Sequence, residues 1–344
     1  MYKNKVSIIV PAFNAEKSIK KCLQSIQKQS FRDIEIIIIN DGSNDRTLDV
    51  CKKLAKTCKL KLFSISHSGP ATARNMGLEK ASGEFVFFLD ADDYLPSNSI
   101  KVLVNQAEKE KSDITIGSFT RRDYRKKRSE KIIPLNKKQI LFKKQIALQG
   151  KKYLDVPNKN ILFAFSWGRL FARKIIIKQK IKFNPQLCSF EDLDFNWRFL
   201  KHVSKVSFVS KNVYFYLVNH QNSSATFSFQ RRPDELFGFP TALISIQKTI
   251  SSLFSTTPGK ISIDRAYVAL SIIQLIRLCN QINLANIWAI FNYISFFIRT
   301  PKFRSYLKHY FPENDESRII PLLLRLQWSF GLIVFCKIKA ALRY

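Results

Sequence analysis

The sequence predicts an α/β protein in which a mostly parallel β-sheet, flanked by helices, is followed by a C-terminal helical module. The first 120 residues alternate short β-rich apolar segments with helical ones, and this order builds a parallel sheet with helices on both faces. Beyond Arg231 the apolar residues recur at spacings of three and four, which is typical of amphipathic helices. The segment between these parts is less regular.

Five strands and four helices are predicted before residue 120. The segments IEIIIIN and FVFFLD are continuously apolar, as parallel strands buried on both faces are. Pro70 suits a first helical turn, and Ser97 is a candidate cap. The predicted strands are Ser7–Phe13, Ile34–Asn40, Lys59–Ile65, Glu84–Leu89 and Asp113–Phe119, and the predicted helices are Ala15–Ser30, Asp45–Thr57, Pro70–Ala81 and Ser97–Glu110.

Composition and charge restrict the classes of partner. The 46% content of hydrophobic residues excludes a disordered chain, and 57 Lys and Arg against 26 Asp and Glu give a net charge of +31. This charge favours nucleic acid, anionic lipid or a phosphorylated substrate and does not choose among them. The basic run from Arg121 to Lys131 is expected to be a solvated loop, with a phosphate or lipid contact as the alternative.

The six cysteines show no CxxC and no close Cys/His pairing, which argues against a zinc site and a disulfide framework. Buried free thiols in a reducing compartment are expected. The first residues contain no secretory signal with a small-residue cleavage site, so a cytoplasmic protein is expected.

Two C-terminal segments are candidates for contact with a membrane. Leu278–Ile298 is uncharged, but its Asn, Gln and Ser residues would make a spanning helix costly. Arg318–Tyr344 mixes apolar and aromatic residues with Lys and Arg, the mixture of a helix that lies in an anionic membrane surface. A helix packed on the protein itself is the alternative.

Polar residues follow three of the predicted strands. Ligands of open α/β sheets bind at the carboxyl ends of the strands, so these positions are candidates for the functional site. The three segments are Pro11-Ala12-Phe13-Asn14-Ala15-Glu16, Asn40-Asp41-Gly42-Ser43-Asn44-Asp45 and Asp90-Ala91-Asp92-Asp93.

The third segment indicates a cation. Asp90, Asp92 and Asp93 would repel one another at the end of a buried strand unless a cation neutralises them, and oxygen ligands favour Mg²⁺ or Mn²⁺. Such an ion keeps coordination sites for substrate phosphates, which points to a nucleoside diphosphate. No GxxxxGK[ST] or GxGxxG motif is present, which argues against P-loop and nicotinamide chemistry. The alternative is that these acids cap a helix or form a turn.

A second acidic group lies at Glu191, Asp192 and Asp194. Displacement of a diphosphate from a sugar by a hydroxyl requires a group that accepts the hydroxyl proton, and this segment supplies carboxylates. Capping of a helix N-terminus is the alternative.

The segments SIIVPAFNAE, INDGSNDRT, GPATARNMGL and FLDADD, in this order, resemble the nucleotide-sugar domain of family 2 glycosyltransferases, which have the GT-A fold. The resemblance is close from residue 5 to about 120. It continues more loosely to about 226, through SWGRLF at 166–171, which is similar to the family's W-x-K-L-[FY] segment. It implies a GT-A domain at 1–229, with a nucleotide-sugar half (1–120) and an acceptor half (121–229), before a basic helical module at 230–344.

The resemblance also implies roles for the donor-side residues. Asp41 would accept a hydrogen bond from uracil, which agrees with the chemistry of a carboxylate at a strand end, although a plain Asp-Gly turn is the alternative. Arg74 would lie beside the nucleotide, Asp90 near the ribose and Asp92 on the metal, with Ala91 between them. The nucleoside pocket would be lined by Pro11, Ala12, Phe13, Asn14 and Glu16.

On the acceptor side, the resemblance implies that Asp192 is the base, that Glu191 orients the acceptor, and that Trp167 contacts the acceptor. His220 would bind the metal or the phosphate, and Ser224 would close over the diphosphate, although the family's usual arginine is absent near His220. A surface or packed histidine is the alternative for His220.

The predicted function is that of a metal-dependent glycosyltransferase that uses Mn²⁺ or Mg²⁺ and a UDP-sugar, and the family resemblance implies that it inverts the anomeric configuration. It would add one hexose or N-acetylhexosamine to a surface glycan or lipid-linked acceptor at the cytoplasmic face of the membrane. Processive members of the family carry a Q-x-x-R-W motif, which Asn196-Trp197-Arg198 matches only superficially, so single-sugar transfer is expected. A basic nucleic-acid-binding or scaffold protein is the alternative, but the three acidic strand ends would repel a phosphate backbone, so no nucleic acid partner is expected.

Overall fold

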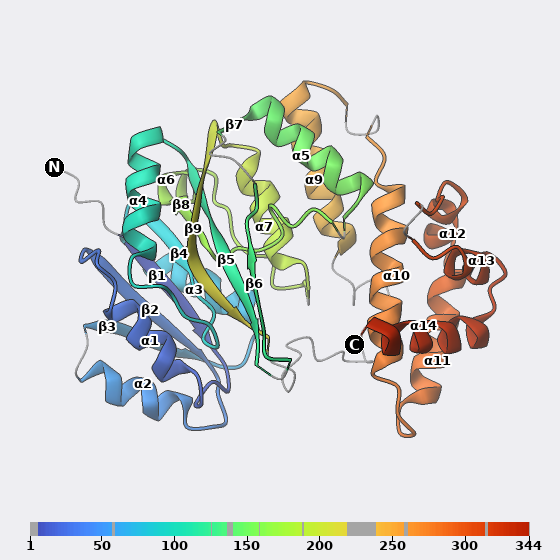
Figure 1. Ribbon diagram of the computed structural model, residues 1–344, viewed down its shortest axis with the longest axis horizontal. Helices are drawn as coiled ribbons and strands as arrows, with labels where there is room; N and C mark the ends of the chain where they lie inside the picture. The colour runs from blue at the N-terminus through green and yellow to red at the C-terminus, as the bar shows by residue number, and fades with distance from the viewer. Residues whose placement is uncertain are drawn as a thin grey trace. The chain divides into compact units, whose positions relative to one another are not determined.

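The computed structural model describes residues 6–56, 59–124, 126–135, 140–157, 159–187, 189–218, 239–257, 261–313 and 316–343 (Figure 1). The chain divides into two compact units. The sheet unit comprises Met1–Ile146, Leu162–Gln186 and Glu191–Ser224, and the helical unit comprises Ala147–Ile161, Leu187–Phe190 and Ala225–Tyr344. The domain boundary expected at residue 229 stays a prediction.

One sheet organises the sheet unit, with the strand order β3-β2-β1-β4-β8-β5-β9-β7 and β6 paired to β5. The strands β1 to β4 are mutually parallel, as predicted, whereas β8 runs antiparallel to both β4 and β5. The strands are β1 (Val6–Ala12), β2 (Ile34–Asp41), β3 (Leu60–Ile65), β4 (Phe85–Phe88), β5 (Ile114–Asp123), β6 (Arg128–Ile132), β7 (Leu141–Phe142), β8 (Arg169–Ala172) and β9 (Lys205–Leu217).

Helices follow the strands of this unit in the predicted alternation, and Figure 1 shows them beside the sheet. They are α1 (Ile19–Gln27), α2 (Thr47–Ala55), α3 (Pro70–Lys80), α4 (Ser99–Glu110), α6 (Arg173–Lys178) and α7 (Glu191–Leu200), while α5 (Lys143–Asp155) spans the division at residue 146.

Three local expectations need correction. Helix α1 begins at Ile19 rather than Ala15, because the Thr47 hydroxyl and the Asp45 carboxylate accept the backbone N–H groups of Ala15 and Glu16. Ser97 does not cap α4, which begins at Ser99. The basic run that was expected to be a loop instead forms the end of β5 and most of the exposed strand β6, paired in antiparallel register.

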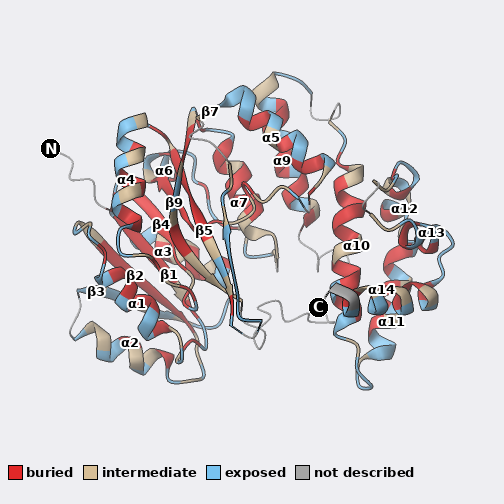
Figure 2. Cartoon of the chain, viewed as in Figure 1, coloured by how far each residue is buried: buried red, intermediate tan, exposed pale blue. Residues whose placement is uncertain are grey.

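The helical unit is built around α10 (Asp264–Asn280), whose residues are mostly buried and therefore red in Figure 2. It packs against α9 (Phe239–Phe254), α11 (Ile287–Arg299), α12 (Pro301–Lys308) and α14 (Ser329–Arg343), and α13 (Ile319–Arg325) packs on α14. The uncharged stretch 278–298 is divided between α10, a turn and α11. Among the described residues, no helix is both long enough and apolar enough to cross a bilayer.

Four of the cysteines lie in the described part of the chain, and they are free and buried, as predicted. They are Cys22, Cys51, Cys279 and Cys336.

A buried carboxylate fixes the start of the sheet. Glu35 of β2 accepts hydrogen bonds from the Ser7 hydroxyl at 2.5 Å, from the Gly83 N–H at 2.9 Å and from the ammonium of Lys61 at 2.8 Å. Both the N–H and the hydroxyl of Ser82 also donate to it. Burial alone would raise the pKa of Glu35, but the hydrogen bonds from Lys61, Ser7 and Ser82 lower it to about 2.

Replacement of Glu35 by Gln is expected to reduce the free energy of unfolding by about 3 kcal/mol at pH 7, because that is the value of a shift from 4.5 to about 2. Since the pKa is lower in the folded state, this stabilisation is present above pH 4.5 and is lost as the pH falls from 4.5 to 2. Urea unfolding at pH 7 and pH 3 measures it. Glu108→Gln, at an exposed carboxylate of α4, should leave stability nearly unchanged, and an equal loss in both variants would contradict the assignment.

Candidate active site

The loops that follow β1 and β2 are joined by hydrogen bonds at the carboxyl edge of the sheet. The side chain of Asn14 accepts from the N–H of Asn44 at 2.9 Å, and the hydroxyl of Ser43 accepts from the N–H of Asn14 at 3.1 Å. Glu16 accepts from the N–H of Arg46 at 3.1 Å. Asn14 itself has a φ of 47°, in the left-handed region that Asn tolerates. The first two predicted polar segments therefore form one connected rim.

Asp41 is buried at the end of β2 and holds the loop that leads into α3. Its two carboxylate oxygens accept the N–H groups of Ser68 at 2.8 Å and Gly69 at 2.9 Å, and Nδ1 of His67 lies 3.0 Å from Oδ2. The ring of His67 stacks on that of Phe13, with 4.0 Å between centroids. Each carboxylate oxygen can accept more than one hydrogen bond, so these contacts leave the predicted base contact of Asp41 chemically open. That role stays a prediction.

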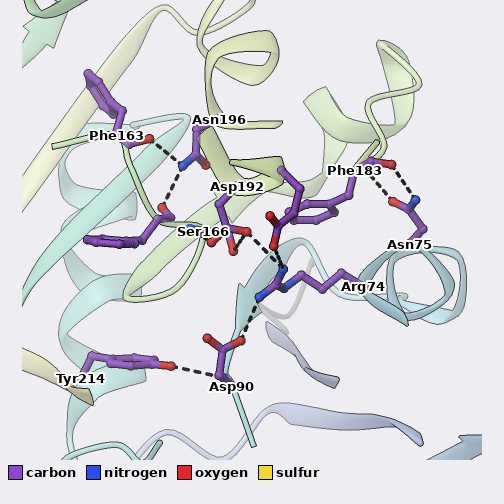
Figure 3. Close-up of polar contacts among 11 residues, drawn as sticks. Arg74, Asn75, Asp90, Phe163, Ser166, Phe183, Asp192, Asn196 and Tyr214 are labelled. Atoms are coloured by element: carbon purple, nitrogen blue, oxygen red, sulfur yellow. Dashed lines mark hydrogen bonds and ion pairs between the residues drawn. The ribbon is translucent and has the colours of Figure 1, made fainter. Parts of the chain in front are cut away.

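Arg74 of α3 is the centre of the site (Figure 3). Its guanidinium donates from Nη2 to Asp90 Oδ1 at 3.0 Å and from Nη1 to Glu191 Oε1 at 3.1 Å, and Nη1 lies 3.2 Å from Asp192 Oδ1. The side chain is 6% exposed. The two acidic groups, about 100 residues apart in sequence, therefore meet at one buried cation.

The electrostatics of this cluster follow from three carboxylates around one guanidinium. Burial lowers the pKa of Arg74, but the charges of Asp192, Asp90 and Glu191 more than reverse this effect and raise it above its usual value. Burial raises the pKa of Asp90 against the opposing effect of Arg74. Burial and the charge of Asp192 raise the pKa of Glu191, which Arg74 likewise opposes. The cluster carries more negative charge than Arg74 can neutralise.

Asp192 is held in one orientation by the chain that precedes β8. The N–H and the hydroxyl of Ser166 donate to its two carboxylate oxygens, both at 2.9 Å. The carboxamide of Asn196, one turn further along α7, donates to the carbonyls of Phe163 and Phe165 at 2.9 and 2.8 Å, which fixes this segment (Figure 3). Asp192 is thus positioned by the two hydrogen bonds from Ser166.

Asp93 and Tyr214 join the FLDADD segment to β9. The Tyr214 hydroxyl donates to Asp93 at 2.7 Å and accepts from the N–H of Asp90 at 3.2 Å, and the N–H of Leu217 donates to Asp93 at 2.7 Å. Burial raises the pKa of Asp93 well above its usual value. Asp93 is therefore a structural anchor, and it leaves Asp90 and Asp92 as the carboxylates that face the site.

Asp92 differs from its neighbours because its side chain is exposed and makes no hydrogen bond to another residue in the described part of the chain. The protein packed around it and the charge of Asp90 nevertheless raise the pKa of Asp92 to about 6. Among the described residues, no three His, Cys, Asp or Glu side chains are arranged to hold a metal alone. One free carboxylate fits a hard cation that takes most of its ligands from a substrate's phosphates.

Trp167 lies inside an aromatic stack and offers little surface. It is 6% exposed, and its ring stacks on Phe165 at 4.6 Å, on Tyr214 at 4.6 Å and on Tyr216 at 5.5 Å. The stack supports the segment that holds Asp192. The predicted acceptor contact of Trp167 stays a prediction, while His220 and Ser224 lie outside the described residues.

Sequence analysis missed the residues that hold the site together. Ser166 stands within the SWGRLF segment, in which only Trp167 was given a role, and Tyr214 precedes His220 by six residues and drew no attention. Nothing in the sequence indicated a role for His67 except its position shortly before the GPATARN segment. The acidic groups were found because carboxylates are conspicuous, whereas their hydrogen-bond donors are common residue types.

Arg169 is a buried cation with two unsatisfied guanidinium nitrogens among the residues that the structure describes. It is 3% exposed, and its Nε and Nη1 atoms find no hydrogen-bond partner among the described residues. Burial lowers the pKa of Arg169 to about 9, and the charge of Asp192 opposes this. An unpaired buried charge costs folding free energy, so the fold retains Arg169 at the expense of stability.

Replacement of Arg169 by Met is expected to stabilise the sheet unit by about 1 kcal/mol, because an apolar side chain of similar length has no desolvation cost. Thermal unfolding should show a midpoint about 2–4 °C higher. Arg169→Lys retains the buried charge and should show no increase. A lower midpoint for Arg169→Met would contradict this expectation, because it would mean that the folded protein gains stability from the guanidinium.

Comparison with known proteins places this geometry in a family. The Glycosyl transferase family 2 model matches residues 7–179. The chain is 33% identical over 226 residues to the cholesterol galactosyltransferase of Borreliella burgdorferi, which covers 63% of this chain and 60% of that protein. It is 32% identical over 224 residues to the poly(ribitol-phosphate) beta-N-acetylglucosaminyltransferase TarP of Staphylococcus aureus, covering 64% of each. In both cases the match spans less than two thirds of the relative.

Among solved structures, residues 1–349 of S. aureus TarS in complex with UDP have a similar fold, with a TM-score of 0.64, 20% identity and coverage of 99% of this chain and 92% of that one. The likeness confirms the predicted α/β fold of GT-A type, including the C-terminal helices. Since the family model matches just over half of the 344 residues, the chain belongs to glycosyl transferase family 2.

Proposed function

We propose that the protein is an inverting glycosyltransferase that moves one hexose or N-acetylhexosamine from a UDP-sugar to a hydroxyl of a surface glycan or lipid-linked acceptor. One observation carries this proposal. Arg74 joins Asp90, at the end of β4, to Glu191 and Asp192, at the start of α7. The carboxylate suited to the nucleotide and the carboxylate suited to the acceptor thus lie within reach of one guanidinium.

The donor side of the proposal is a nucleoside diphosphate sugar. Phe13 supplies an exposed ring and Asp41 a buried acceptor at the same edge of the sheet, which suits a flat base with an N–H group. A TarS structure of similar fold was solved with UDP-GlcNAc, and it has a TM-score of 0.64 and 18% identity. The named activities of the Borreliella and TarP relatives are transfers of galactose and N-acetylglucosamine, which supports a hexose or N-acetylhexosamine.

Asp192 is the proposed general base. It would accept the proton of the acceptor hydroxyl as the oxygen bonds to the anomeric carbon, while the bond from that carbon to the diphosphate breaks and UDP leaves with the electron pair. Ser166 fixes the carboxylate at 2.9 Å through two donors, so little reorganisation is needed. Attack from the face opposite the leaving group inverts the anomeric configuration. Glu191 is the proposed neighbour that orients the acceptor.

The proposed cofactor is Mn²⁺ or Mg²⁺, held by Asp92 together with the donor's phosphates. When bound, the ion would neutralise charge on the leaving diphosphate. The free carboxylate of Asp92 and the excess negative charge beside it support this assignment. His220 remains a proposed second ligand.

The proposed place of action is the cytoplasmic face of the membrane, where a basic protein can remain near an acceptor carried by anionic lipid. The net charge of +31 supports it. We propose single-sugar transfer, because the processive motif is absent from the sequence. A scaffold or nucleic-acid-binding role has no structural observation in its favour.

Asp192→Asn is expected to lower the rate of transfer to an acceptor sugar by 10²- to 10⁴-fold, because the amide cannot accept the hydroxyl proton. Affinity for the UDP-sugar, measured by calorimetry, should change little. The donor can be selected by a thermal-shift screen of UDP-sugars. Glu79→Gln, at an exposed carboxylate of α3, serves as the control and should retain full activity. A transfer rate that Asp192→Asn leaves unchanged would disprove the assignment of the base.

Asp92→Ala is expected to reduce the release of UDP from the donor in the presence of Mn²⁺ by about 100-fold, because the diphosphate loses the ion that neutralises it. UDP release without an acceptor is the measurement. Asp49→Ala changes an exposed carboxylate of α2 and should release UDP at the normal rate. Unchanged release by Asp92→Ala would remove the metal role of this residue.

A further inference from the structure

The last two helices of the helical unit expose an unusual amount of apolar surface. Helix α13 buries Ile320, Leu323 and Leu324, and α14 buries Leu332 and Cys336, so each helix already contributes one face to the core. Besides Ile319 at the start of α13, which is 48% exposed, six further large apolar side chains on or between these helices are 43–64% exposed. They form what we call the C-terminal apolar face: Leu322, Leu326, Trp328, Phe330, Val334 and Ile338.

The spacing places these side chains in stripes. Phe330, Val334 and Ile338 are four residues apart on α14, and Leu322 and Leu326 are four apart along α13 and its end, so each set lies on one side of its helix. Trp328 stands at the junction, where its ring packs within 2.6 Å of a Cβ placed on Gly331. A side chain at Gly331, in the first turn of α14, would therefore push the indole aside, so glycine lets the ring pack there. A soluble helix normally turns charged residues toward water, so a second apolar face indicates a partner.

The charge around this face is of one sign. From Ser317 to Tyr344 there are five Lys and Arg and no acidic residue. From Arg265 to Tyr344 the count is eleven Lys and Arg against three acidic residues, and Glu313 and Glu316 of these three pair with Arg265. Lys337 is exposed and stands between Val334 and Ile338. Apolar side chains bordered by cations match a bilayer with anionic headgroups.

We propose that the C-terminal apolar face binds the surface of an anionic membrane, with α13 and α14 lying in the plane of the bilayer. Trp328 and Phe330 enter the interface. The ammonium of Lys337 donates to the carbonyl of Ile282 at 3.4 Å in the structure, and on the membrane it exchanges this contact for the headgroups while its methylene chain stays among the apolar residues. A second copy of the chain fits less well, because a twofold interface would bring this all-basic surface against itself. The inference uses only the helical unit and does not depend on glycosyl transfer by the sheet unit.

Flotation with lipid vesicles tests this inference on the full chain. We expect binding to vesicles of phosphatidylcholine with 30% phosphatidylglycerol, and at least tenfold weaker binding to phosphatidylcholine alone. The double variant Leu326→Ser/Phe330→Ser should bind at least tenfold more weakly, because two apolar side chains no longer leave water. Lys337→Gln should reduce binding about fivefold, and 0.5 M salt should reduce it further.

The control is Phe142→Ser/Ile177→Ser, which changes exposed apolar side chains in the sheet unit. These side chains are 50% and 53% exposed, against 64% for both Leu326 and Phe330. The control should bind like the unchanged protein. In a Trp288→Phe background Trp328 is the one exposed tryptophan, and its emission should shift to the blue on addition of anionic vesicles, since Trp167 and Trp197 are buried. Loss of binding in the control, or no effect of the double variant, would overturn the inference.

Two further measurements separate the alternatives. Light scattering that shows a dimer, converted to a monomer by Leu326→Ser/Phe330→Ser, would assign the face to a second copy and overturn membrane binding. UDP release from the donor should be the same in this double variant and in the unchanged protein, because the altered residues lie in the helical unit. Vesicle binding by a protein that releases no UDP would leave the inference standing and remove the proposed function.

Discussion

The buried guanidinium of Arg74 is the interaction on which the candidate site depends. Its guanidinium contacts Asp90, Glu191 and Asp192, and among the described residues no other cation forms an ion pair with them, so without it three carboxylates would face one another in a poorly solvated space. Removal of one partner from a buried ion pair costs about 3–5 kcal/mol, and here one cation serves three anions. Arg74 thereby ties α3 to the end of β4 and to the start of α7. The position of the end of β4 relative to the start of α7 is fixed by this contact.

The extent to which the fold could be predicted depends on how local its causes are. The strands β1 to β4 and helices α1 to α4 were predicted because each contains, within a few residues, an apolar run or a helical spacing of apolar residues. Strand β8 was not predicted, since its four residues form a strand only by pairing with β4 and β5, which lie far away in sequence. Strand β6 was not predicted for the same reason. Its charged sequence is typical of a loop, and it forms a strand by pairing with β5.

The candidate site was predictable in its chemistry and not in its contacts. The acids of FLDADD and EDLD were identified as groups, but nothing in the sequence indicates that Asp93 is used by Tyr214 or that Ser166 holds Asp192. Trp167 illustrates the same limit, because an aromatic residue in a motif can contact a ligand or fill a core. Likewise the period of apolar residues predicts α14 as a helix, whereas it cannot tell which of its two apolar faces the protein itself covers.

Charge gives the last connection between sequence and site. Six of the 26 acidic residues stand in FLDADD and EDLD, so a protein of net charge +31 keeps its functional edge negative. At long range the overall positive field attracts an anionic substrate, and such steering raises the association rate. At short range the carboxylates would repel the phosphates of the same substrate. Arg74 already forms ion pairs with three of these carboxylates. This balance of charge is the physical reason for the proposal that a cation, Asp92 and the donor bind together.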